Sequence, residues 1–76
     1  MIKLDELTNP NSCFNKAQDS EMLFVLLERD PAATAAVAAW INERIRLGKN
    51  KPDDPKILDA QRWIHTVHER HDIATR

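Results

Sequence analysis

The chain has 76 residues, a formal net charge of -1 and a single cysteine. A chain of this length forms one domain near the lower size limit. It buries only about 60% of its unfolded surface, so its core is marginal unless something adds to it. A lone cysteine excludes an internal disulfide. The near-zero charge gives no bulk attraction to nucleic acid, and one glycine with no tyrosine disfavours a sheet. We therefore expect one all-α domain over residues 1–76, stabilised by assembly into a homodimer.

Three of the four prolines directly follow a residue that favours the N-cap of a helix. These pairs are Asn9-Pro10, Asp30-Pro31 and Asp54-Pro55. Proline is tolerated at the first helical position because the amide hydrogen that it lacks has no helical partner there. Pro52 follows Gly48 and belongs to the loop that ends the third helix. The pattern predicts four helical segments, at residues 10–17, 20–29, 31–47 and 55–71.

The N-terminal part of the chain predicts one short helix. Residues 10–17 form a short helix in which Cys13 is a small buried hydrophobe, and only a loose turn, holding Leu4 and Leu7, precedes it. Cys13 with a distant histidine would supply a nucleophile and a base, but catalysis needs both in one pocket with an orienting group. We expect no catalytic residue and no enzymatic activity.

The most apolar stretch is residues 22–27, MLFVLL. It makes the predicted helix 20–29 apolar on nearly every side, so we expect this helix to be the central and most buried element. A buried strand is the alternative, because the length and periodicity of such a run cannot decide between the two. In either case Phe24 and Leu27 belong to the predicted core.

The two long helices, 31–47 and 55–71, are joined by a short basic loop, so we expect them to pack antiparallel in a compact bundle with the two shorter segments. At the 100° step of a helix each carries an apolar stripe. The stripes are Val37, Ile41 and Ile45 on the first helix, and Ile57, Leu58, Ala60, Ile64 and Val67 on the second. Trp40 is the expected large anchor of the packing.

Several polar side chains occupy positions within or beside these stripes. On the last helix Gln61, His68 and His71 project from the apolar arc, with Trp63 on one edge and His65 on the other. One interpretation is a metal site completed by a cysteine or an acid, but helical zinc pairs usually sit four residues apart. Another is that imidazoles in the last turns complement the helix dipole. The third, which we adopt, is that they face a partner chain, with no metal or cofactor.

Arg44 lies one turn after Trp40 within the apolar arc. In one interpretation its stem lies over apolar surface while the guanidinium reaches solvent or stacks on the Trp40 ring. In the other it forms a bidentate pair with Asp19 or Glu21 of the acidic N-terminal third. The residues that we predict to form an interaction surface are Trp40, Arg44, Gln61, Trp63, His68 and His71.

The segment 9–41 resembles a set of small helical proteins of phages and prophages, whose pattern is D-P-x-S-C-x-x-K-A, then D-E-P-x-F-V-L, then an aspartate, an alanine-rich stretch and a tryptophan. Asn9 replaces the first aspartate, and Ser20-Glu21-Met22 stands where Asp-Glu-Pro would. The residues that fit are Pro10, Ser12, Cys13, Lys16, Ala17, Phe24, Val25, Leu26, Asp30, Ala33 and Trp40. The resemblance implies an accessory protein of a mobile element that binds a host protein, such as a defence component, or a signalling molecule.

These observations lead us to expect a non-enzymatic interaction protein in the cytoplasm of the bacterial host. No apolar run is long enough for a membrane span. One alternative is a small-ligand binder, for instance of a nucleotide second messenger. In it Arg44, Arg46 and the histidines would hold phosphates, and Trp40 or Trp63 would stack on the base. Another is a nucleic-acid-binding regulator that uses the basic segment 44–56, although that segment has no interleaved aromatic residue and a solvated loop is the better reading.

Overall fold

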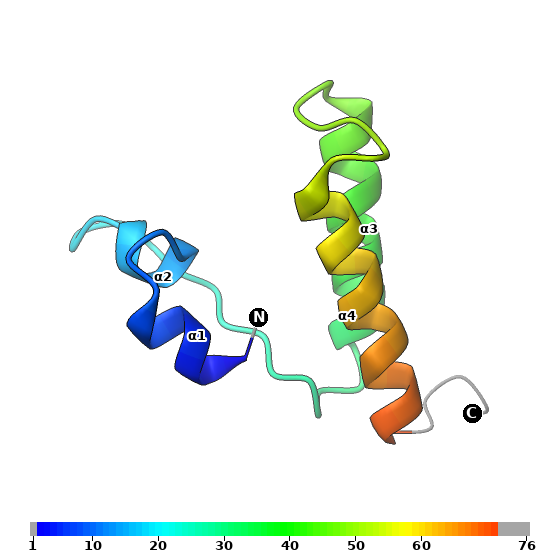
Figure 1. Ribbon diagram of the computed structural model, residues 1–76, viewed down its shortest axis with the longest axis horizontal. Helices are drawn as coiled ribbons and strands as arrows, with labels where there is room; N and C mark the ends of the chain where they lie inside the picture. The colour runs from blue at the N-terminus through cyan, green and yellow to red at the C-terminus, as the bar shows by residue number, and fades with distance from the viewer. Residues whose placement is uncertain (1, 72–76) are drawn as a thin grey trace.

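The computed structural model describes residues 2–71, and no residue in this range lies in a strand. Its helices are α1 (Lys3–Thr8), α2 (Cys13–Lys16), α3 (Ala33–Arg46) and α4 (Pro55–His71). None of the described helices is long and apolar enough to cross a membrane. Figure 1 shows α3 and α4 side by side as an antiparallel hairpin, with α1 and α2 next to each other away from it.

The all-α class and the packing of the two long helices are confirmed. The predicted packing of both N-terminal segments on the long helices is not found. Among the described helices α1 and α2 pack only on each other, and the segment 20–29 meets α4 through Glu28. Residues 17–32 join these two units as non-helical chain (Figure 1). The described part of the chain is therefore a helical hairpin and a small N-terminal unit joined by a connector.

The core lies between α3 and α4 and uses the predicted stripes. Ile41, Ile57 and Ala60 form a buried cluster against which partly buried apolar residues of both helices pack. Ile57 is fully buried, whereas its neighbour Leu58 is 42% exposed. Trp40, the predicted anchor, keeps 38% of its surface exposed. Ile41, which belongs to the predicted stripe, is buried as expected, whereas the neighbouring tryptophan is not.

The end of α3 is set by the only glycine. Gly48 has a φ of 72°, in the left-handed region, and lies directly after the C-cap residue Leu47. The amide of Gly48 donates to the carbonyl of Ile45 and that of Lys49 to Arg44, both at 3.0 Å. These are the two hydrogen bonds of a Schellman motif, which satisfies the last carbonyls of a helix.

The proline rule holds at one of its three positions. α4 begins at Pro55, as predicted. Before the other two prolines the N-cap residue instead closes a turn on its own backbone. Asn9 Oδ1 accepts the amide of Asn11, and Asp30 Oδ1 accepts that of Ala32, each at 2.8 Å. α2 and α3 consequently start two or three residues later than predicted.

The N-terminal unit is held by polar contacts centred on Ser12 and Asn15. Ser12, the N-cap of α2, accepts the amide of Asn15 at 3.1 Å and donates to the carbonyl of Glu6 at 2.6 Å. The side-chain nitrogen of Asn15, Nδ2, lies within hydrogen-bonding distance of three backbone carbonyls, those of Glu6, Leu7 and Asn9. Neither α1 nor α2 contains a buried residue. The predicted loose turn is the helix α1, and Cys13 is exposed, not buried.

The predicted helix 20–29 is wrong, and so is the alternative of a strand, because residues 22–27 are irregular and largely exposed. Phe24 is 88% exposed and Leu27 is 50% exposed, so neither belongs to the core. A helix shorter than about 12 residues is marginal in water unless one face packs on something. A helix over residues 20–29 would have no distinct apolar face, and the apolar stripes of α3 and α4 already pack on each other. Such a helix would therefore have no surface to pack against.

Candidate interaction surface

The dominant surface feature is the run of six consecutive large apolar residues Met22–Leu27, which we call the apolar run. Met22 is 95% exposed, Phe24 88% and Val25 70%, and Leu23 and Leu27 are about half exposed. Leu26 alone is partly buried. Contiguous apolar surface of this kind on a soluble domain typically marks a contact with another molecule.

Both ends of the apolar run are fixed by hydrogen bonds. Before it, Gln18 and Glu21 form a reciprocal pair, since the Glu21 amide donates to the Gln18 carbonyl at 2.9 Å and the Gln18 amide donates to Glu21 Oε1 at 3.0 Å. After it, the Asp30 amide donates to the Leu27 carbonyl at 3.0 Å. The run is therefore displayed between two turns.

Glu28 attaches the end of the run to the last turn of α4. Its Oε1 accepts from Arg70 Nη1 at 2.8 Å, and its Oε2 lies 2.9 Å from His71 Nε2. The hydrogen bond from His71, together with the positive charge of Arg70, lowers the pKa of Glu28 from its ordinary value of 4.5. This contact joins residues more than 40 positions apart, so it fixes where the run leaves the hairpin.

The backbone of the apolar run is open. Within residues 2–71, the amides and carbonyls of Met22–Leu26 take part in no hydrogen bond, and the only bonded backbone group of Leu27 is its carbonyl. Exposed peptide groups beside apolar side chains are what a strand at the edge of a sheet presents to another chain. The run therefore offers side chains and backbone groups to a partner at the same place.

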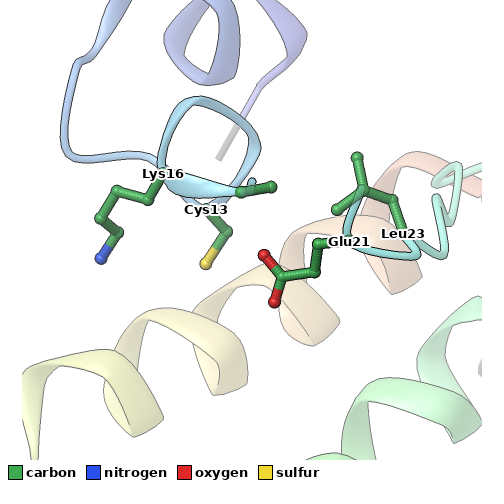
Figure 2. A pocket seen from close by; sticks show the side chains of 5 residues that line it. Cys13, Lys16, Glu21 and Leu23 are labelled. Carbon is green, nitrogen blue, oxygen red and sulfur yellow. The ribbon is translucent and has the colours of Figure 1, made fainter. Parts of the chain in front are cut away.

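A shallow hollow lies between α2 and the start of the apolar run (Figure 2). It is lined by Cys13, Lys16, Ala17, Glu21 and Leu23. The Glu21 carboxylate points toward Cys13 across it, while the Lys16 side chain points away. Leu23 thus lines the same hollow as Cys13 and Lys16 of α2, so this end of the run faces α2 of the same molecule.

The second surface feature is Trp40 with two cations. The Arg44 guanidinium lies over the ring, 5.8 Å from its centroid, and the Lys56 ammonium is 6.0 Å from it. Arg44 Nε donates to Asn50 Oδ1 at 2.6 Å, so Arg44 contacts Trp40 and the loop, not Asp19 or Glu21. Asn50 in turn donates to Asp54 at 3.1 Å.

The loop clasp formed by Asn50 and Asp54 is reinforced by a backbone contact. The Lys51 amide donates to Asp54 Oδ2 at 2.9 Å. This bond, with that from Asn50, lowers the pKa of Asp54 below its ordinary 3.8. The clasp holds Arg44 beside Trp40 at the loop end of the hairpin.

The predicted C-terminal residues lie further along α4. His71 bonds to Glu28, and His65 pairs with Glu69 at 2.8 Å. His68 and Trp63 are half-buried and Gln61 is exposed. No group of three metal-ligating side chains gathers within the described residues. The six predicted interaction residues are therefore spread along the hairpin, with Trp40 and Arg44 toward its loop and His71 at its far end.

Sequence reasoning placed the apolar run in the core and missed three contributors, Glu28, Asn50 and Lys56. The available signal for the run was its lack of a polar face, which fits an unpacked segment as well as a buried one. Comparison with protein-family models, curated protein sequences and solved structures finds no match to this chain.

Proposed function

We propose that this chain is a non-enzymatic interaction protein whose apolar run docks on another polypeptide. One observation carries the proposal, namely that five of the six consecutive large apolar residues Met22–Leu27 are exposed, between two turns closed by hydrogen bonds. Burying such side chains contributes about 25 cal/mol per Å² of apolar surface. Phe24 and Met22, the most exposed, are the expected energetic centre, because large apolar and aromatic anchors dominate interfaces.

In the setting that the phage resemblance implies, the docked polypeptide is a protein of the bacterial host and the site of action is the host cytoplasm. Consecutive side chains of an extended segment point in opposite directions, and in the apolar run both sets are apolar, as in a strand that is buried on both faces. This favours a partner that encloses the run. Glu28 holds one end of the run on α4, so the run enters the contact with part of its conformational freedom already lost, which favours affinity.

The test places a photo-crosslinking residue at Phe24 of the full-length chain in bacterial lysate. The control carries it at Asn42, which is also exposed. Specific products are expected from position 24 only. A product joining two copies of this chain has twice its mass, so it is separable from a product with a host protein.

Binding of each purified product partner is then compared between wild type, Phe24→Ser and Leu58→Ser. Phe24 is 88% exposed and Leu58 42% exposed, so Phe24→Ser should keep the wild-type melting temperature and Leu58→Ser should lower it by only a few degrees. Phe24→Ser should weaken binding at least tenfold, the loss expected for an interface anchor of about 2 kcal/mol, and Leu58→Ser should not. Equal binding by all three proteins would remove the apolar run from the interface.

The contact of Trp40 with Arg44 and Lys56 favours a second candidate, a site for an anionic aromatic ligand such as a nucleotide. A ring beside two cations can stack on a base while the cations meet phosphate. Thermal shift with a nucleotide panel tests this, because a ligand at about 100 times its dissociation constant stabilises by roughly 2.7 kcal/mol. A shift that Trp40→Ala or Lys56→Gln abolishes would support the site, and no shift with any nucleotide would refute it.

A further inference from the structure

The described chain exposes more large apolar side chains than it buries. Ile41, Ile57 and Val67 are the buried ones of this size, whereas twelve large hydrophobic residues are exposed, five of them in the apolar run. A domain of this size has little stability to spare. When no other protein covers the run, the molecule available to cover it at high local concentration is a second copy of the chain.

We propose that the apolar runs of two copies pair as antiparallel strands, with Val25 of each copy opposite Val25 of the other. The inference rests on the proposed docking role of the run and names a partner for it. The run contains no glycine, proline or charge, and short segments of that composition pair readily as strands. Within residues 2–71 the chain has no strand of its own to offer, so the same segment of the second copy is the natural counterpart.

The charges that flank the run select this register. With Val25 on the twofold axis, the strand of each copy ends at Leu27, and Arg29 in the turn that follows it comes beside Glu21 of the other copy, which gives an attractive pair at both ends. Shifting the register by one residue places Glu21 opposite either Glu28 or Asp30, both acidic. A parallel, in-register pair would set Glu21 against Glu21 and Arg29 against Arg29. Like charges directly opposite destabilise a strand pair.

The turn after the run selects the pairing edge. In a strand the peptide groups of alternate residues point to opposite edges. The Leu27 carbonyl already accepts from the Asp30 amide, which blocks part of the edge formed by Leu23, Val25 and Leu27. The other edge, formed by Met22, Phe24 and Leu26, has all its backbone groups open. Pairing through that edge leaves the blocked one outside, which limits growth beyond two copies.

The affinity of this pair should be modest. A two-stranded ribbon is marginal in water unless something backs it, and here Leu23 lies beside α2 on one side only. We therefore expect a monomer–dimer equilibrium within the micromolar to millimolar range, weak enough for a tighter-binding protein to displace the second copy.

The experiment exchanges the flanking charges in the full-length chain and measures the dissociation constant by sedimentation equilibrium. The variants are Glu21→Arg and Arg29→Glu, which each create two like-charge pairs in the proposed register, so each should weaken the dimer about tenfold. An equimolar mixture of the two variants recreates both attractive pairs between unlike chains, so it should dimerise as wild type does. Because each variant is compared with itself in the mixture, loss of the local Glu21–Gln18 bond is controlled for.

Amide hydrogen exchange tests the edge. Protection that rises with protein concentration is expected at Met22, Phe24 and Leu26, and not at Leu23, Val25 or Leu27. A strictly monomeric wild type, a dimer that neither variant weakens, or a mixture that fails to recover would each overturn the pairing. A dimer strengthened by Glu21→Arg alone would instead place Glu21 opposite another acid and refute the register. These results leave the proposed docking function untested. That function is refuted by a different result, namely that the crosslinked partner binds Phe24→Ser with the same affinity as wild type.

Discussion

The substitution Ile57→Ala should be the most damaging single truncation in the helical hairpin. Ile57 is fully buried in the cluster with Ile41 and Ala60. The change removes three carbons, which at about 0.8 kcal/mol for each buried CH₂ is roughly 2.4 kcal/mol before any cavity is counted. Measured losses for such changes in cores run from about 2 to 5 kcal/mol. A domain of this size has a total stability of roughly 4–11 kcal/mol, so the loss is a large fraction of it.

The assay is thermal unfolding followed by circular dichroism at one fixed protein concentration, because self-association would otherwise shift the midpoint. At about 4–8 °C per kcal/mol for a domain of this size, Ile57→Ala should lower the melting temperature by at least roughly 10 °C. Leu58→Ala is the matched control, since Leu58 is the next residue and is 42% exposed; it should cost less than about 1 kcal/mol. Equal shifts for the two variants would show that α4 does not present Ile57 to α3.

Three further predictions address the turn, the N-terminal unit and the anchor of the apolar run. Gly48→Ala should destabilise by about 1–2 kcal/mol in chemical denaturation, because the φ of 72° strains any residue with a Cβ although the space around it is open. Asn15→Ala should speed amide exchange in α1 and α2 without lowering the melting temperature of the α3–α4 hairpin, since its hydrogen bonds all lie within the N-terminal unit; a lowered hairpin midpoint would contradict the separation of the two units. The hydrogen bond from His71 and the charge of Arg70 lower the pKa of Glu28, so the contact stabilises above pH 4.5 and is lost as the pH falls through the lowered pKa; a carboxyl NMR titration should find a midpoint below 4.5 that His71→Gln raises, and an unmoved midpoint would refute the contact.

The α3–α4 hairpin could be predicted from the sequence because its signals agree with one another. The stripes of Val37, Ile41 and Ile45 and of Ile57, Ala60 and Ile64 recur at helical spacing, and they form the observed core. Gly48 and Pro55 then fix one helix end and one helix start through backbone rules that apply locally. Where periodicity and punctuation coincide, little else is needed to place a helix.

The N-terminal unit could not be predicted in the same way. Its stability comes from Ser12 and Asn15 bonding to carbonyls of α1, and such bonds depend on the turn at residues 9–11 as well as on residue type. Asn9 before Pro10 reads as a helix cap, but its side chain closes that turn on the Asn11 amide instead. The same competition between cap and turn displaced the predicted start of α3 at Asp30.

The apolar run exposes the limit of reasoning from hydrophobicity. A large apolar residue is expected inside, but burial also requires a surface that is not yet occupied. The facing stripes of α3 and α4 cover each other, and Ile57 and Ile41 have almost no exposed surface left. Hydrophobicity alone does not show whether the surface that would bury a segment is already covered. The prediction therefore placed the six apolar residues in a core that α3 and α4 form between themselves.

An exposed apolar run favours aggregation, and the charged residues next to it oppose this. Segments of this composition stack with their own kind when nothing opposes it, and charged residues at the ends of such a segment act against it. Glu21 precedes the run, and Glu28 and Arg29 follow it. Because Glu28 is paired with α4, the opposite charges of Glu21 and Arg29 are the ones available to a second copy, and they do more than repel. They disfavour the parallel stacking that propagates without end, and they favour the single antiparallel register in which two copies satisfy each other. The bond from Asp30 to the Leu27 carbonyl then removes part of the remaining edge. The same few residues that leave the run available to a partner thus also limit how the free chain can pair with itself.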